Sequence, residues 1–153
     1  MEDAEIQVPM SSLGLDVTVP CEARYLPILR QLVHRAVEYI GYHKSLRDEV
    51  VQTIEHAVHG VFETNENAYT DIELQLDTTE HSMLVRIRYL GAPARGEGPS
   101  AIEQLLAQPD GDGVRLDRLR RAMKTVVLGR ESGAGGADFC ELTRELPDGP
   151  WDP

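Results

Sequence analysis

The feature that most restricts the fold of this chain is a switch of hydrophobic period, from the spacing of a helix to that of a strand. Two stretches repeat apolar residues at intervals of three and four, which predicts two successive amphipathic helices. Their stripes are Leu26, Leu29, Val33, Ala36, Val37 and Ile40, and then Val50, Ile54, Ala57, Val58 and Val61. Residues 71–76 and 83–89 alternate apolar and polar side chains around a polar turn at 78–81, which predicts a β-hairpin. Elements that each carry one apolar face must pack face to face.

Residues at the helix ends indicate where each helix begins and stops. We expect the first helix to start near residues 22–23, with Pro27 tolerated because it lies in the first turn. Gly41 is a typical residue just after a helix. Ser45 is a good N-cap for the second helix, which we expect to end before Thr64.

Four further segments complete the predicted order. Residues 15–19 alternate as a first strand, and a short helix is expected over 100–108. A glycine-rich turn at 132–136 leads into a last strand at 137–146. Between the short helix and the glycine-rich turn we predict a helix over 114–128. Its inward-facing side chains are Leu116, Leu119, Ala122, Met123 and Val126.

This order predicts an α+β fold: a two-layer sandwich with a mixed or antiparallel sheet and helices on one face. We expect a flexible N-terminal segment at 1–13, a single domain at 14–148 and a tail at 149–153.

Charge and composition exclude several classes of function. The net charge of −11 disfavours nucleic acid as a main partner, and the basic cluster at 115–121 fits the solvated face of a helix. No apolar run approaches the length of a membrane span, and the acidic N-terminus does not resemble a signal peptide. Two distant cysteines indicate a reducing environment, so we expect a cytoplasmic protein with no membrane partner.

Several short strings, in this order of elements, resemble the anti-sigma-factor serine kinases of the RsbW kind. They are Val-Pro at 19–20, Tyr-Leu at 25–26, Ile-Gly-Tyr at 40–42, Arg-Arg-Ala-Met at 120–123 and Arg-Glu-Leu-Pro-Asp at 144–148. That family belongs to the GHKL superfamily, which includes the ATPase domains of histidine kinases. The resemblance covers most of the chain and implies a Bergerat-type ATP-binding fold.

The resemblance implies a site on the second helix, where family members carry a Glu that activates water or a hydroxyl and an Asn four residues later that binds magnesium. Aligned without a gap after the first helix, His56 stands in place of the Glu and Gly60 in place of the Asn. A shift of one residue gives Glu55 and His59 instead. The Asn is absent in both registers, so Glu55 and His56 are candidate bases only if the chain is active.

The other two family boxes are also altered. After the hairpin, family members carry an Asp two residues before a glycine, and this Asp reads adenine. Gly91 fits the glycine, but Tyr89 replaces the Asp. The phosphate-binding turn before the last helix is represented by Gly111 and Gly113, with Arg115 in place of a further glycine. Three separate losses predict a degenerate ATP pocket in which bound ATP or magnesium is not expected.

Other candidate sites have competing explanations. His56, His59 and Glu63 have metal-type side chains at helical spacing, although polar residues beside a former nucleotide pocket explain them equally well. Cys140 is a potential nucleophile, but its place in a predicted strand favours a buried thiol. The glycine-rich segment 132–136 precedes a strand, which favours a hairpin turn over a phosphate loop.

These observations favour a regulatory protein-binding module without catalysis. The resemblance implies partners in bacterial transcription control: a sigma factor, an anti-anti-sigma protein of the STAS type, or a second copy of the chain through residues 15–40. Two alternatives remain open at this level. One is an active protein-serine kinase, and the other is a metal- or ligand-binding module that reuses the pocket.

Overall fold

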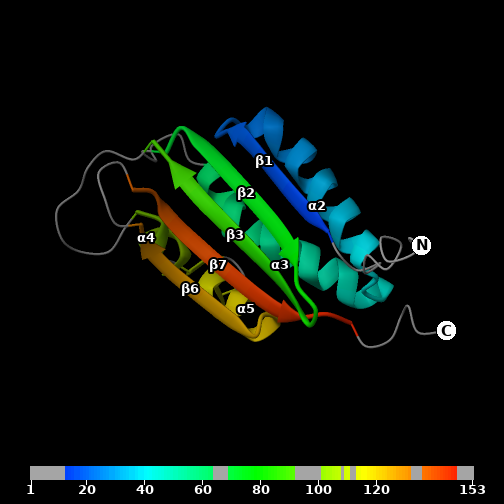
Figure 1. The fold of residues 1–153 in the computed structure, drawn as a ribbon. Helices are drawn as coiled ribbons and strands as arrows, with labels where there is room; N and C mark the ends of the chain where they lie inside the picture. The colour runs from blue at the N-terminus through cyan, green and yellow to red at the C-terminus, as the bar shows by residue number, and fades with distance from the viewer. Residues whose placement is uncertain are drawn as a thin grey trace.

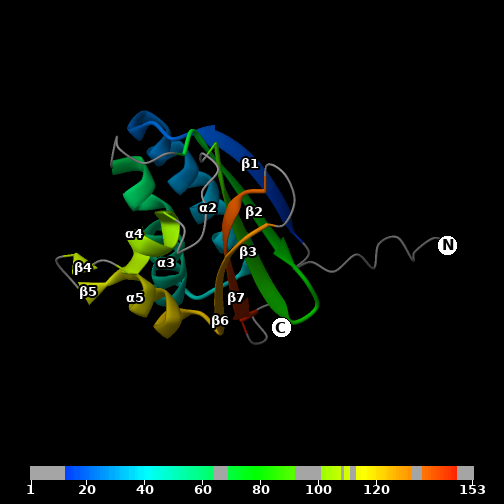
Figure 2. The ribbon, with the colours of Figure 1, turned by 90° about the vertical axis from the view of Figure 1, so that its left-hand side faces the viewer.

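The computed structural model describes residues 13–63, 69–91, 101–107, 109–110, 113–131 and 136–147. The described part forms two layers, a sheet and a layer of helices (Figure 1). Viewed from the side, helices α2, α3, α4 and α5 all lie on one face of the sheet (Figure 2). The predicted α+β two-layer arrangement is therefore confirmed, and the sheet is antiparallel throughout its described strands.

The strands of the main sheet lie in the order β1-β2-β3-β7-β6, so β1 and β6 are the edge strands and the last strand of the chain, β7, lies inside the sheet. A separate two-stranded ribbon is formed by β4 and β5. The elements in chain order are β1 (Gly14–Pro20), a 3-10 turn η1 (Ala23–Tyr25), α2 (Leu26–Ile40), α3 (Lys44–Glu63), β2 (Asp71–Thr78), β3 (Ser82–Leu90), α4 (Ala101–Ala107), β4 (Pro109–Asp110), β5 (Gly113–Val114), α5 (Arg115–Ala122), β6 (Thr125–Arg130) and β7 (Asp138–Glu145).

The core lies between the sheet and α2 and α3, as the two hydrophobic periods predict. On β2 and β3 every second side chain is buried, and the helical stripes face them. The wholly buried side chains of the sheet include Ile72, Leu74, Leu76, Met83, Val85, Ile87, Tyr89, Cys140 and Leu142. The alternation places these apolar side chains on the helix-covered face, which is why the hairpin could be recognised from its period of two.

The predicted helix over 114–128 is wrong in its second half. Helix α5 ends at Ala122, Met123 is extended with ψ of 150°, and residues 125–130 form the edge strand β6. In β6, Val126 lies opposite Leu142 of β7. A run of β-branched residues fits a strand at least as well as a helical stripe, and pairing with β7 decides the matter. The sheet therefore has five strands, one more than the sequence predicted, and β6 and β7 form the hairpin expected around 132–136.

The predicted helix boundaries are partly correct. Gly41 ends α2 in the left-handed conformation with φ of 104°, as its identity predicts. Ser45 is not the N-cap of α3, because the carbonyl of His43 already accepts a hydrogen bond from the Arg47 amide at 2.6 Å. Lys44 is the first residue of the helix, and Ser45 lies within its first turn. Residues 109–110 and 113–114 form the β4–β5 ribbon, which the local sequence pattern does not predict.

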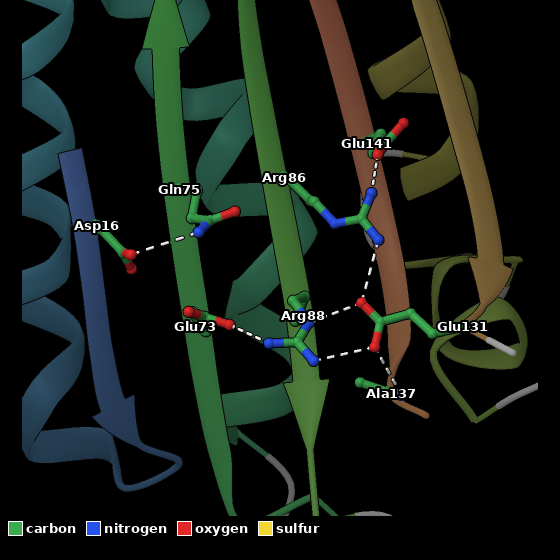
Figure 3. A network of polar contacts seen from close by, with 8 residues as sticks. All are labelled: Asp16, Glu73, Gln75, Arg86, Arg88, Glu131, Ala137 and Glu141. Atoms are coloured by element: carbon green, nitrogen blue, oxygen red, sulfur yellow. Dashed lines mark hydrogen bonds and ion pairs between the residues drawn. The ribbon is translucent and has the colours of Figure 1, made fainter. Parts of the chain in front are cut away.

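The outer face of the sheet carries a network of charged side chains (Figure 3). The Arg88 guanidinium donates two hydrogen bonds to the carboxylate of Glu131, at 2.8 and 2.9 Å, and a third to Glu73. Arg86 bonds to Glu131 and to Glu141 on the next strand. Glu131 thus joins two arginines of β3 at the point where β6 ends, so charge pairing stabilises the face that no described helix covers.

The first prediction concerns Glu131. Hydrogen bonds from Arg88, supported by those from the Ala137 amide and Arg86, lower the pKa of Glu131 from 4.5 to about 2. Because the pKa is lower in the folded state, this stabilisation is complete above about pH 5 and is lost as the pH falls toward 2. Glu131→Gln should reduce the free energy of unfolding by about 1–2 kcal/mol at pH 7 and by less at acid pH, measured by urea unfolding.

Glu80→Gln is the matched control, because the Glu80 side chain lies in the β2–β3 turn and is 89% exposed. It should change the stability by only a few tenths of a kcal/mol at either pH. Parallel stability curves for wild-type protein and Glu131→Gln between pH 7 and pH 3 would contradict the role assigned to the network.

Candidate functional site

Tyr89, near the end of β3, occupies the position where the family resemblance places an adenine-reading carboxylate. Its side chain is completely buried, and its hydroxyl donates a 2.7 Å hydrogen bond to the carbonyl of Ala57 on α3. Its ring lies 5.5 Å from the ring of Tyr69. Burial raises the pKa of Tyr89 well above its ordinary value of 10.0, so the hydroxyl stays protonated and acts as a donor. The ring therefore fills interior space between the sheet and α3.

A second buried group lies beside Tyr89 and was not found from the sequence. Asp138 of β7 is paired with Tyr89 in the register of the sheet and is only 3% exposed. It accepts a 2.5 Å hydrogen bond from the Tyr69 hydroxyl and a 2.8 Å hydrogen bond from Arg130 Nε. The Tyr69 oxygen in turn accepts a bond from the Ile102 amide at 3.0 Å. This cluster connects α4 to the end of the sheet.

A signal for Asp138 does exist in the sequence. It lies two residues before Cys140 and four before Leu142, so the strand alternation puts all three on the buried face. A charged residue at an inward position requires a partner. Neither Tyr69 nor Arg130 could be named as that partner, because Tyr69 is 69 residues away in the chain and Arg130 was expected outside the sheet.

The two candidate bases on α3 face different neighbours. Glu55 forms an ion pair with Arg30 of α2. His56 lines a hollow of about 260 Å³ between α3 and α5, together with Arg118 and Arg121. Consecutive residues of a helix point about 100° apart, and here the two side chains lie toward different elements. Of Glu55 and His56, only His56 lies on the side of α3 that faces α5. The third candidate, His59, is half-buried and lies about one turn further along α3.

The remaining predicted site residues belong to the segments that surround α5. Gly91 follows β3 with φ of 88°, and Gly113 begins β5. Arg115 is the first residue of α5, which packs against α3. Gly60 belongs to the last turns of α3. Gly111 lies outside the described residues, so the structure does not place the predicted phosphate turn.

Metal and thiol chemistry find little support in the described part of the chain. Within it, no three His, Cys, Asp or Glu side chains group as metal ligands, although the side chain of Glu63 lies outside the description. Burial raises the pKa of Cys140 to about 12 and that of Cys21 to about 11. Both thiols therefore stay protonated near neutral pH, which supports a structural role for Cys140.

Comparison with known proteins returns no relative. The chain matches no protein-family model and no curated protein sequence. No helix in the described residues is both long enough and apolar enough to cross a bilayer.

The second prediction concerns the backbone conformation of Gly91. A Cβ at Gly91 would lie 2.3 Å from Thr70 Oγ1, and its φ of 88° is strained for any other residue. Gly91→Ala should lower the free energy of unfolding by about 1–3 kcal/mol, measured by urea denaturation.

Gly14→Ala is the control for this substitution. A Cβ there would lie 3.3 Å from one oxygen of Asp77, and Gly14 has no positive φ. We expect a change within about 0.5 kcal/mol. Equal effects of the two substitutions would show that the conformation of Gly91 carries no special strain.

Proposed function

We propose that this chain is a regulatory protein-binding module with a degenerate ATP site, similar in role to an anti-sigma factor. Its partner is a sigma factor, a STAS-type antagonist or a related regulator. The observation that carries the proposal is the burial of Tyr89, whose ring and hydroxyl are committed to Ala57 and Tyr69 at the position where a nucleotide-binding relative needs a carboxylate. The Tyr89 hydroxyl already donates its proton to the Ala57 carbonyl, and a phenol oxygen is a weaker acceptor for the adenine amino group than a carboxylate is.

The exposed face of α2 supports a role in protein binding. Ile28 and Tyr39 are 52% and 57% exposed, although both have large apolar surfaces. They are eleven residues apart, about three turns, so they lie on the same face of the helix. Such side chains favour a protein interface at the helix that the resemblance implies for contacts. The net charge of −11 suits a partner with a basic surface.

The third prediction concerns nucleotide binding. Addition of millimolar Mg-ATP should leave the melting temperature of the protein unchanged, because the adenine position is filled by Tyr89. A ligand present at 100 times its dissociation constant would raise the free energy of unfolding by about 2.7 kcal/mol, so binding of ordinary affinity could not escape detection. The measurement is a thermal-shift titration of the full chain.

A clear stabilisation by Mg-ATP would contradict the proposal and favour the active kinase of the same family. Substitutions of the two candidate bases would then distinguish the two possible alignments of α3 with the family. Loss of phosphate transfer in His56→Ala with retention in Glu55→Gln would assign catalysis to the side of α3 that faces α5. The reverse result would assign it to the side that faces α2.

The fourth prediction concerns the partner. Affinity capture with the full chain as bait, followed by mass spectrometry, should identify a sigma factor or a STAS-type protein. Ile28→Asp and Tyr39→Asp should each weaken binding of the purified partner about tenfold or more, because each places a charge in an apolar contact.

The matched control is Val127→Asp, which removes an exposed apolar side chain, 46% exposed, from the edge strand β6 instead. It should leave the affinity unchanged. If Val127→Asp weakens binding and the two α2 variants do not, the partner binds at the other edge of the sheet and the proposed surface is wrong.

A further inference from the structure

An open hollow lies at the end of the sheet opposite to Tyr89. It has a volume of about 430 Å³ and forms where the C-terminal end of β7 meets the start of α3 and the turn between α5 and β6. Figure 1 shows this end of β7 beside the β2–β3 hairpin, with α4 at the other end of the strand. The volume falls within the range of small-molecule sites, about 300–1,000 Å³. The residues that line it are Tyr42, Leu46, Lys124, Arg144, Glu145, Leu146 and Pro147.

One wall of the hollow is apolar and held in place by the fold. Tyr42 is 4% exposed, and its hydroxyl donates a 2.7 Å hydrogen bond to the carbonyl of Glu145. Leu46, in the first turns of α3, is 36% exposed, which leaves part of its apolar surface facing solvent. The Leu146 amide bonds to the carbonyl of His81 at 3.0 Å, so the chain just after β7 is held to the hairpin.

The Arg144 guanidinium is positioned before any ligand arrives. Arg144 Nη1 donates a 2.5 Å hydrogen bond to the carbonyl of Ala122, and the guanidinium carbon Cζ lies 5.7 Å from the centre of the Tyr42 ring. A guanidinium has five N–H donors, and the bond to Ala122 uses one of them. An arginine held in this way loses little conformational entropy when it binds a carboxylate.

Lys124 supplies a second cation at the same hollow. Its backbone amide bonds to the Thr143 carbonyl at 2.7 Å, which fixes the start of β6. Its ammonium lies 3.3 Å from a carboxylate oxygen of Glu145, with side-chain exposures of 60% and 71%. An ion pair this exposed contributes little to stability, so an incoming anion can replace Glu145 at small cost.

We propose that this hollow is a binding site for a small anion with an apolar body, such as an aryl- or alkyl-carboxylate. The carboxylate lies between Lys124 and Arg144, and the apolar body packs against Leu46, Leu146 and Pro147. Two cations and one carboxylate give this hollow a positive balance in a chain whose net charge is −11. The site is separate from the Tyr89 region, so it stands or falls independently of the proposed regulatory function.

The test uses three related probes with the full chain, followed by two-dimensional NMR. 3-Phenylpropionate carries both the anion and the apolar body, 3-phenylpropionamide lacks the charge, and propionate lacks the body. We expect 3-phenylpropionate to bind with a dissociation constant on the order of 1 mM, as its size allows. The other two probes should bind at least tenfold more weakly. Equal binding of acid and amide, or no binding of the acid, overturns the proposal.

Surface variants locate the binding without disturbing the core. Lys124→Glu should weaken 3-phenylpropionate at least tenfold, and Leu46→Glu should do the same by placing a carboxylate at the apolar wall. Arg24→Glu makes the same change of charge as Lys124→Glu at an arginine that is 73% exposed in η1, so it should leave the affinity unchanged. Equal loss in Arg24→Glu would mean that general charge attraction, and not this hollow, holds the probe.

Discussion

The contact of Tyr89 with α3 is the constraint on which the rest of the structure depends. Its hydroxyl bonds to the backbone of α3 at Ala57, and its ring packs beside Tyr69, so one side chain joins the sheet, the central helix and the segment before β2. A buried phenol without a partner would be costly, and the Ala57 carbonyl supplies that partner. The proposal of a degenerate ATP site rests on this same contact.

The two ends of the sheet therefore differ in character. At the end near α4, the Tyr69 and Arg130 side chains satisfy the buried carboxylate of Asp138. At the opposite end, Arg144 and Lys124 border an open hollow between β7 and the start of α3. The chain thus has its buried polar cluster where the resemblance would place a ligand. Its open hollow lies where the resemblance places none.

Much of the fold was predictable because the strongest signals are local. The stripe of α2, the alternation of β2 and β3, and the left-handed Gly41 each depend on residues close together in the chain. The second half of the predicted helix at 114–128 failed because Val126 continues the helical stripe of Ala122 and Met123 but also fits, together with Leu128, the alternation of a strand. The edge position beside β7 decided between them, and that neighbour is not visible in a local window.

The sequence by itself determined the layer order, the buried faces and the absence of the carboxylate expected at Tyr89. Only the tertiary structure decided what each candidate side chain contacts. It turned Glu55 toward Arg30 and His56 toward α5, and it joined Tyr69 to Asp138 across 69 residues. It also gathered Tyr42, Lys124 and Arg144 around one hollow. The physical reason is that periodicity records which face of an element is buried, whereas hydrogen bonds and ion pairs depend on which distant element packs against that face.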